Sequence, residues 1–168
     1  MNWYKQAFHF FGKQSANIIP FNVDTIDDVD YDQYEYADQA EQVFRDTKIR
    51  PDNTKNLSHL AVEDGRVVGA ISSGWSNDKN TGHGEGDVWI YSFDIAVLSK
   101  FRKGLTGLKL ISEAIKTYQS DRLEYEDMGG QTMMRLWVVN PNLIPILERY
   151  GFQIEAEHGN GSAHMVMY

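Results

Sequence analysis

The chain has 168 residues, with 24 acidic side chains against 16 basic ones, a formal net charge of −8, and no cysteine. This length favours one domain with a sizeable core. The charge disfavours nucleic acid and favours a cationic partner, although an acidic surface also simply keeps a protein soluble. The absence of cysteine excludes disulfides, thiolate zinc ligands and a cysteine nucleophile.

No apolar run approaches the roughly 20 residues that cross a membrane. The aromatic N-terminus lacks a small-residue cleavage site, so it does not resemble a signal peptide. We therefore expect a cytoplasmic protein without a membrane partner. Residues 3–12 predict an amphipathic helix that docks on the body of the protein, with a partner-binding arm as the alternative.

The next segment is strongly acidic. Residues 21–46 hold nine carboxylates and one arginine. Their C-terminal part predicts a helix with its apolar side formed by Tyr36, Ala40, Val43 and Phe44. The carboxylates form either a solvated face or a surface that attracts an amine.

The middle of the chain predicts β-structure. Residues 57–63 and 66–75 flank Asp64-Gly65, a strong hairpin signal because such a turn needs positive φ. A polar, glycine-rich connection over 77–86 leads to a long and mostly buried strand over 87–98.

The C-terminal half alternates helices and strands. Apolar spacing predicts a helix from Leu105 to about Tyr118, and a strand follows over 132–139. A short helix over 141–150 ends at Gly151. The last two segments, "FQIEAE" and "AHMVMY", form an antiparallel pair around "HGNGS". The order predicts a mixed α/β domain.

A charged turn, "FRKGLTG", joins the strand over 87–98 to the helix that follows it. The N-terminus of a helix presents unpaired N–H groups and the positive end of the helix dipole, which suits phosphate. Glycines allow a close approach, and Arg102 and Lys103 add charge. An exposed turn with solvated cations is the alternative.

This junction resembles the central motif of the GNAT superfamily of N-acetyltransferases, a Q/R-x-x-G-x-G/A loop that holds the pyrophosphate of acetyl-coenzyme A. The loop is one residue shorter than the common form. The first position of the motif can therefore be aligned with either Arg102 or Phe101. The resemblance implies that acetyl-coenzyme A binds at Arg102, Lys103, Gly104, Leu105, Thr106 and Gly107.

A second segment, "NPNLIPILERYGF", resembles another GNAT motif, an asparagine followed by a short helix and a hydrophobic-Gly-Phe ending. Asn140 matches the asparagine and is implied to bind the cofactor. In the family the preceding strand diverges from its neighbour, and coenzyme A lies in the gap; here residues 93–98 and 137–139 would form its walls. Leu147 stands where many members have the tyrosine that protonates the thiolate. Tyr150 is the candidate acid, with water as the alternative.

The resemblance covers residues 57–168, the implied acetyl-CoA-binding core, and leaves residues 1–50 as a variable N-terminal helical region. It implies that residues 1–168 form a single α/β GNAT-like domain, with a mixed, mostly antiparallel sheet flanked by helices.

Acetyl transfer needs a neutral amine, a polarised thioester carbonyl and a proton for the thiolate. Backbone N–H groups of Ile95, Ala96 and Val97 are candidates to polarise the carbonyl. Asp94 interrupts an apolar strand and is the candidate base, although pairing with a cation would also explain it. Ser92 lies on the same face of the strand as Asp94, because side chains alternate between the two faces.

Other polar residues are weaker candidates. Glu85 and Asp87 are alternative bases at the strand entrance. His83 has no second histidine at ligand spacing, so we expect it on a loop surface and expect no metal. The methionines at 133, 134, 165 and 167 and the two tryptophans at 75 and 89 are expected to fill the core.

The sequence thus predicts an acetyl-CoA-dependent N-acetyltransferase acting on a primary amine of a small molecule or peptide, with a cationic acceptor. The alternative is a non-catalytic protein of this fold, a coenzyme-A-binding sensor or a protein-interaction module. Nucleic acid is not expected as a partner. The oligomeric state is left open between monomer and homodimer, since the terminal strands could pair across a dimer.

Overall fold

The computed structural model describes residues 16–21, 31–78, 87–102 and 105–168. The predicted N-terminal helix over 3–12 and most of the connection over 77–86 lie outside these ranges. The described elements are β1 (Asn17–Pro20), α2 (Tyr31–Asp46), β2 (Asn56–Glu63), β3 (Arg66–Asp78), β4 (Val88–Val97), η2 (Ser99–Phe101), α3 (Thr106–Asp127), β5 (Gln131–Val138), η3 (Pro141–Leu143), α4 (Ile144–Arg149), β6 (Gln153–Glu157) and β7 (Ala163–Met167).

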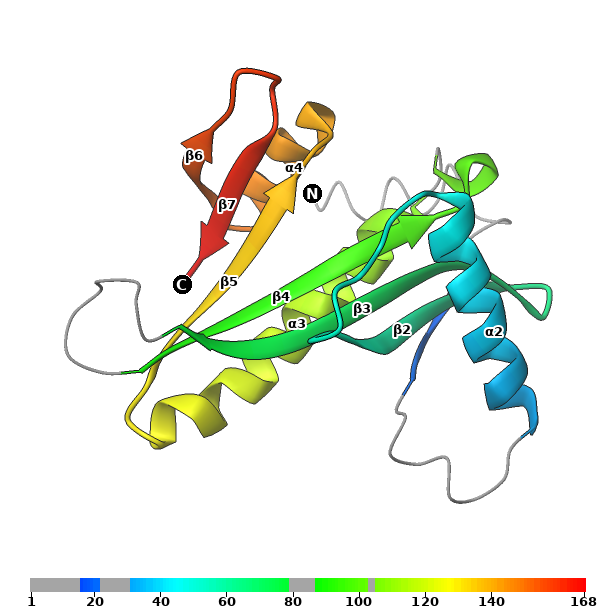
Figure 1. The fold of residues 1–168 in the computed structure, drawn as a ribbon, viewed down its shortest axis with the longest axis horizontal. Coiled ribbons are helices and arrows are strands. Elements are labelled where there is room, and N and C mark those ends of the chain that lie inside the picture. Colours follow the sequence, from blue (N-terminus) through cyan, green and yellow to red (C-terminus); the bar gives the residue numbers. More distant parts are fainter. Residues whose placement is uncertain (1–15, 22–30, 79–86, 103–104) are drawn as a thin grey trace, which may run out of the picture. The chain divides into compact units, whose positions relative to one another are not determined.

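The strands form one seven-stranded sheet in the order β1-β2-β3-β4-β5-β7-β6 (Figure 1). β4 and β5 pair in parallel, whereas β1–β2, β2–β3, β5–β7 and β6–β7 pair antiparallel. The predicted mixed α/β class, with a mostly antiparallel sheet and flanking helices, is confirmed. The chain divides into two compact units, a first unit of Met1–Ser73 with Phe93–Thr117 and a second of Gly74–Ser92 with Tyr118–Tyr168.

The hairpin between β2 and β3 in the first unit confirms the Asp-Gly prediction. Asp64 has φ 49° and Gly65 has φ 73°, so both turn residues adopt the left-handed conformation that a two-residue hairpin requires. The pairing starts at Glu63 with Arg66 and runs back to Asn56 with Ser73. The turn chemistry therefore sets the register beside the turn, and irregularities between Ala61 and Val62 and between Leu57 and His59 shift it further along the strands.

The first unit packs a helix on each face of its strands. Ala40, Val43 and Phe44 of α2 join one apolar cluster with Leu60 and Ala70 of the hairpin, and Figure 1 shows α2 lying across β2 and β3. This confirms the apolar side predicted for that helix.

On the opposite face, Gly69 permits α3 to approach the sheet. A Cβ at Gly69 would lie 3.0 Å from Leu110 Cδ1 of α3 and 3.2 Å from the Ala96 carbonyl oxygen. Glycine in β3 is therefore required by close packing rather than by its φ angle.

Aromatic side chains dominate one face of the second unit. Trp75 stacks on Tyr125 with ring centroids 4.2 Å apart and on Tyr118 at 5.7 Å, and Tyr91 lies 5.3 Å from Trp75. Trp89 contacts Tyr125 at 4.8 Å. Both tryptophans pack in this aromatic cluster, but each is only half-buried, so the expectation that they fill the core is met in part.

The contacts of Tyr125 with the two tryptophans explain why the predicted C-terminal end of α3 is wrong. We predicted that the helix after the charged turn ends near Tyr118, but α3 continues to Asp127. Its last turns are mostly polar and lack an apolar repeat, yet Tyr125 is held by the two tryptophans. Arg122 also pairs with Glu126 at 2.8 Å, one helical turn away.

The rest of the second unit confirms the predicted C-terminal elements. Gly151 has φ 100° and ends α4, as a C′ glycine does, and β7 lies between β5 and β6 (Figure 1). The four methionines expected in the core are all buried, at 133, 134, 165 and 167. Strand β1 was not predicted. Within the described residues, no helix combines the length and apolar character that would let it cross a membrane.

Candidate functional site

The predicted anion site lies at the strand–turn–helix junction of the first unit. β4 ends at Val97, the 3-10 turn η2 follows, and α3 begins at Thr106. The turn is closed by the Phe101 N–H, which donates to the Leu98 carbonyl at 2.8 Å. The first helical bond joins the Lys109 N–H to the Leu105 carbonyl at 2.9 Å. The N–H groups at the start of α3 therefore precede the helical ladder and have no partner within the helix.

Gly107 and Arg102, near the N-terminus of α3, are compatible with the predicted anion site. Gly107 presents no side chain, and a Cβ there would only make ordinary contact with Val97 Cγ2 at 3.8 Å. Packing therefore does not require the glycine, whereas close approach of a ligand to the backbone would. Arg102 is exposed, and its Nε donates to the Val97 carbonyl at 2.8 Å, which ties the cation to the end of β4. Lys103 and Gly104 lie outside the described residues.

The backbone of β4 distinguishes among the three candidate amides. The Leu98 N–H donates to the Val68 carbonyl of β3 at 3.0 Å. Because N–H groups alternate in direction along an extended strand, those of Val97 and Ile95 point away from β3, whereas that of Ala96 points toward it. Ile95 and Val97 are thus the better placed donors for a ligand beside β4.

Asp94, the candidate base, belongs to an ion cluster. Its Oδ2 accepts from Lys55 Nζ at 2.8 Å, and the same ammonium lies 3.2 Å from Asp52 Oδ2. The Lys55 side chain is 11% exposed and that of Asp94 is 31% exposed, so water still reaches the carboxylate. The pairing supplies the structural explanation that the sequence left open, while the accessible carboxylate keeps a role as base compatible with the geometry.

Charge interactions within this cluster favour the ammonium form of Lys55. Burial disfavours its charge, but the hydrogen bonds and charges of Asp94 and Asp52 outweigh burial and raise the pKa of Lys55. The Thr54 hydroxyl and backbone N–H both donate to Asp52 and lower the pKa of that carboxyl. Asp94 therefore faces a permanent positive charge at neutral pH.

The alternative bases are less well defined. Asp87 is exposed just before β4, and its backbone carbonyl accepts from the Gln131 N–H at 2.9 Å. Glu85 and His83 lie outside the described residues. Among the residues that the structure describes, no group of three or more metal-ligating side chains occurs.

The second GNAT-like motif lies in the second unit. The Asn140 side chain accepts from the Asn142 N–H at 3.1 Å and caps η3. Leu147 is buried in the core of this unit, and Tyr150 is half-buried at the end of α4. The parallel ladder between β4 and β5 covers Val88–Tyr91 with Gln131–Met134, while both strands continue beyond it.

The two proposed walls of the coenzyme site fall in different units, residues 93–98 in the first and residues 137–139 in the second. Their role as walls stays a prediction.

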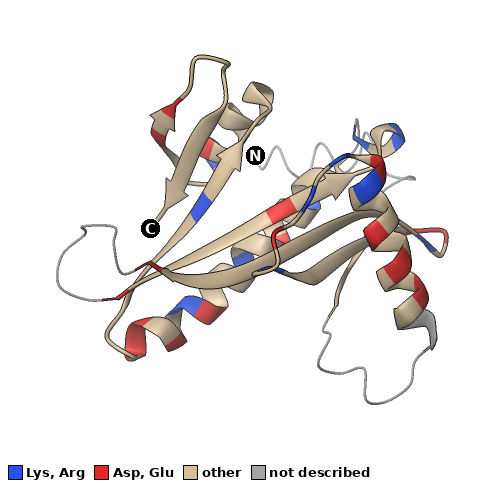
Figure 2. Ribbon diagram, viewed as in Figure 1, with Lys and Arg blue, Asp and Glu red and all other residues tan. Residues whose placement is uncertain are grey.

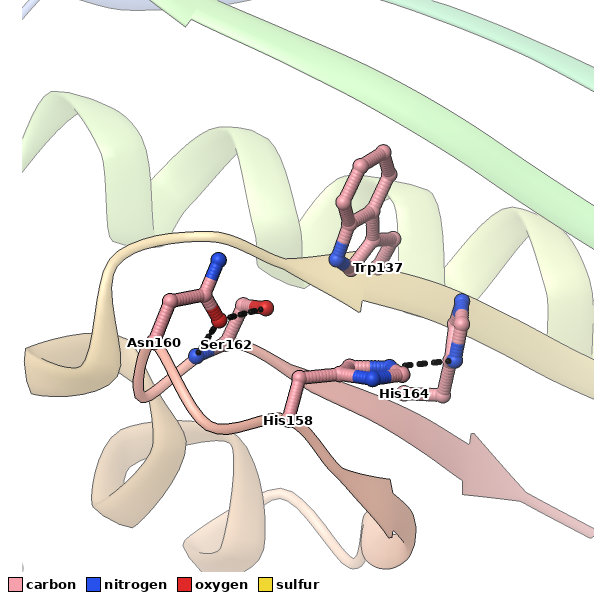
Figure 3. A pocket seen from close by; sticks show the side chains of 5 residues that line it. All are labelled: Trp137, His158, Asn160, Ser162 and His164. Atoms are coloured by element: carbon pink, nitrogen blue, oxygen red, sulfur yellow. Dashed lines mark hydrogen bonds between the residues drawn. The ribbon is translucent and has the colours of Figure 1, made fainter.

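A pocket in the second unit was missed by the sequence prediction. It has a volume of about 330 Å³ and is lined by Trp137, His158, Asn160, Ser162 and His164 (Figure 3). His158 Nε2 and His164 Nδ1 lie 3.1 Å apart. The signal was present, since His158 and His164 flank the tight "GNGS" turn and hairpin pairing brings such residues together.

Comparison with known proteins identifies the fold. No family model and no curated protein matches the sequence. The structure is similar to that of Arabidopsis thaliana NAA60 in complex with acetyl-CoA, at 18% identity and a TM-score of 0.61, covering 90% of this chain and 97% of that one.

Two further structures agree. An aminoglycoside 6'-N-acetyltransferase complexed with coenzyme A matches at 15% identity and a TM-score of 0.55, covering 89% of this chain and 95% of that one. A histone acetyltransferase HPA2 and related acetyltransferase from Corynebacterium glutamicum matches at 14% identity and a TM-score of 0.51, covering 91% and 96%. The chain therefore has a GNAT-like fold, as the two sequence motifs predicted.

Proposed function

We propose that the protein is an acetyl-CoA-dependent N-acetyltransferase that acts on a primary amine. The observation that carries the proposal is the junction from β4 to α3, where a helix N-terminus, Gly107 and the tethered Arg102 meet at the end of a strand. This arrangement suits a pyrophosphate, and the GNAT-like fold supports that use.

The cofactor roles follow from the chemistry of each group. N–H groups at Leu105, Thr106 and Gly107 are assigned to the pyrophosphate together with Arg102. Lys103 and Gly104, which belong to the same loop in sequence, are assigned there as well. The N–H groups of Ile95 and Val97 are assigned to the pantetheine and the thioester carbonyl. Asn140 is assigned to the cofactor because it matches the asparagine of the second motif.

Proton transfer needs two groups. Asp94 is assigned as the base, directly or through one water, because its carboxylate is accessible and lies one residue before the Ile95 amide. The amine attacks the thioester carbon, its proton passes to the base, and the C–S bond breaks. Tyr150 is assigned as the donor of the proton that the departing thiolate takes up.

The acceptor is proposed to be cationic in solution. Figure 2 shows carboxylates along α2, where Glu35, Asp38, Glu41 and Asp46 are exposed. Such a surface raises the local concentration of an ammonium ion. Because attack requires the neutral amine, a base such as Asp94 must then remove the proton.

A non-catalytic coenzyme-A-binding protein is the second candidate. The ion pair of Asp94 with Lys55 and the buried Leu147, at the place of the usual tyrosine, favour it. Both candidates predict cofactor binding, and only the first predicts thiol release that depends on an amine.

Thermal unfolding with acetyl-coenzyme A tests the shared prediction. At a ligand concentration of a hundred times Kd, the free energy of unfolding should rise by about 2.7 kcal/mol. The Arg102→Ala/Lys103→Ala double variant should lose most of this shift, whereas the control Arg50→Ala/Arg66→Ala, which also removes two cations, should retain it. The absence of any shift at millimolar acetyl-coenzyme A would refute the proposal. An assay of thiol release over a panel of amines then separates the enzyme from the sensor.

A further inference from the structure

The β6–β7 hairpin of the second unit presents two histidines in a fixed arrangement. The His158 N–H donates to the Ser162 carbonyl at 2.9 Å, and the Gly161 N–H donates to the His158 carbonyl at 2.9 Å. Asn160 Oδ1 accepts from both the N–H and the hydroxyl of Ser162, at 3.0 and 2.6 Å. These bonds hold the turn that joins His158 to the strand carrying His164, so the backbone brings the two histidines to the same end of the hairpin.

We propose that His158 and His164 form a binding site for a late first-row divalent ion, Zn²⁺, Ni²⁺ or Cu²⁺, with water completing the coordination. Imidazole nitrogen is a preferred ligand of these ions. Neither histidine has a role in the proposed acetyl transfer, although Trp137, which lines the same pocket, also belongs to a proposed wall of the coenzyme site.

The distance between the facing imidazole nitrogens matches the distance between two ligands of one metal ion. Metal–nitrogen bonds of about 2.0–2.1 Å place two ligand nitrogens about 3.4 Å apart at the tetrahedral angle and about 2.9 Å apart at a right angle. His158 Nε2 and His164 Nδ1 are 3.1 Å apart, between these values, and their rings lie at 81° to each other. A shared ion therefore requires only a small adjustment of the side chains.

A hydrogen bond between the imidazoles also fits this distance, and it does not exclude the metal. In a neutral pair, one facing nitrogen carries a proton and the other accepts it. When an ion binds, that proton moves to the other nitrogen of the same ring, so both facing nitrogens present lone pairs. Two neutral histidines thus bind the ion without net release of a proton.

The surroundings do not oppose a cation. The pocket lining contains no lysine or arginine, and the chain carries a net charge of −8. Trp137 pairs with His164 across β5 and β7, and their ring centroids lie 6.1 Å apart (Figure 3). The indole is 67% exposed and can report on an ion bound to the imidazoles.

The test uses the full chain, titrated separately with Zn²⁺, Ni²⁺ and Cu²⁺ by calorimetry. We expect one ion to bind per chain. Both His158→Gln and His164→Gln should lower the affinity for the ion by about tenfold or more. The matched control His83→Gln should leave the affinity unchanged. Circular dichroism verifies that each variant is folded.

Spectroscopy provides a second readout. Cu²⁺ should quench tryptophan fluorescence, and Trp137→Phe should remove most of that quenching while the calorimetric affinity stays the same. The electron paramagnetic resonance spectrum of the Cu²⁺ complex should show two coordinated imidazole nitrogens, reduced to one in either glutamine variant. No binding at millimolar metal would overturn the site and leave a hydrogen-bonded pair. Affinity that survives both substitutions would overturn it as well.

Discussion

Substituting Asp94 by asparagine separates a catalytic carboxylate from a structural one. If Asp94 accepts the amine proton, directly or through water, Asp94→Asn should lower turnover by about 10²-fold or more. Binding of acetyl-coenzyme A should persist, because the groups assigned to the cofactor do not include the Asp94 side chain. The side chain keeps its size and one acceptor oxygen, so the change removes mainly the charge.

The effect on stability is expected to be small. Lys55 loses the charge partner at 2.8 Å, but it keeps Asp52 at 3.2 Å, and the new carboxamide oxygen can still accept its hydrogen bond. A hydrogen bond between charged groups contributes about 1.5–3 kcal/mol, and here most of that interaction is replaced. We therefore expect the free energy of unfolding to fall by about 1 kcal/mol.

The assay is thiol release at saturating acetyl-coenzyme A, normalised to the folded fraction measured by urea unfolding. Asp52→Asn is the matched control, since it removes a charge from the same lysine while leaving the β4 carboxylate intact. It should change turnover little. Equal turnover of the two variants per folded molecule would refute the role of Asp94 as a base and leave the ion pair as its only role.

Two further predictions concern charge. Burial lowers the pKa of His59, against the opposing charge of Glu113, so the folded state disfavours its protonated form and stability should fall as the pH drops below about 6.5. Between about pH 7.5 and 5, the free energy of unfolding measured with urea should fall less for His59→Gln than for the native chain. An equal fall in both would show that His59 is not the cause. For the acceptor, added salt should raise KM because exposed charges are screened over about 8 Å at physiological ionic strength. The Glu35→Gln/Asp38→Asn variant should raise KM at low salt, and a KM indifferent to both changes would show that α2 is only a solvated surface.

Local chemistry made most of the fold predictable. The Asp64-Gly65 turn requires positive φ, and the apolar runs before and after it predict the two strands, β2 of 8 residues and β3 of 13 residues. The boundary of α3 was not predictable in the same way, because Tyr125 is held by Trp75, a residue far away in sequence. β1 has only four residues, and its pairing with β2 fixes it more than its own sequence does.

In the candidate site, too, features set by neighbouring residues could be predicted, whereas contacts between residues distant in sequence could not. The charged turn and the helix start were visible because they are contiguous, and Arg102 bonds to a carbonyl five residues away. The partner of Asp94 was not visible, since Lys55 lies 39 residues earlier and reaches the carboxylate only through its long side chain. The His158–His164 pair was accessible in principle, because hairpin geometry around "GNGS" brings the two residues together.

The interleaving of the two units along the chain has a consequence during synthesis on the ribosome. Three regular elements, β3, β4 and α3, begin in one unit and end in the other. The first unit cannot close until Thr117 has emerged, and the second cannot close until nearly the last residue has. At about 5–20 residues per second, the β2–β3 hairpin waits on the order of seconds for β4. During that time its open edge is exposed to other nascent chains, and recognition by a chaperone would be most useful there.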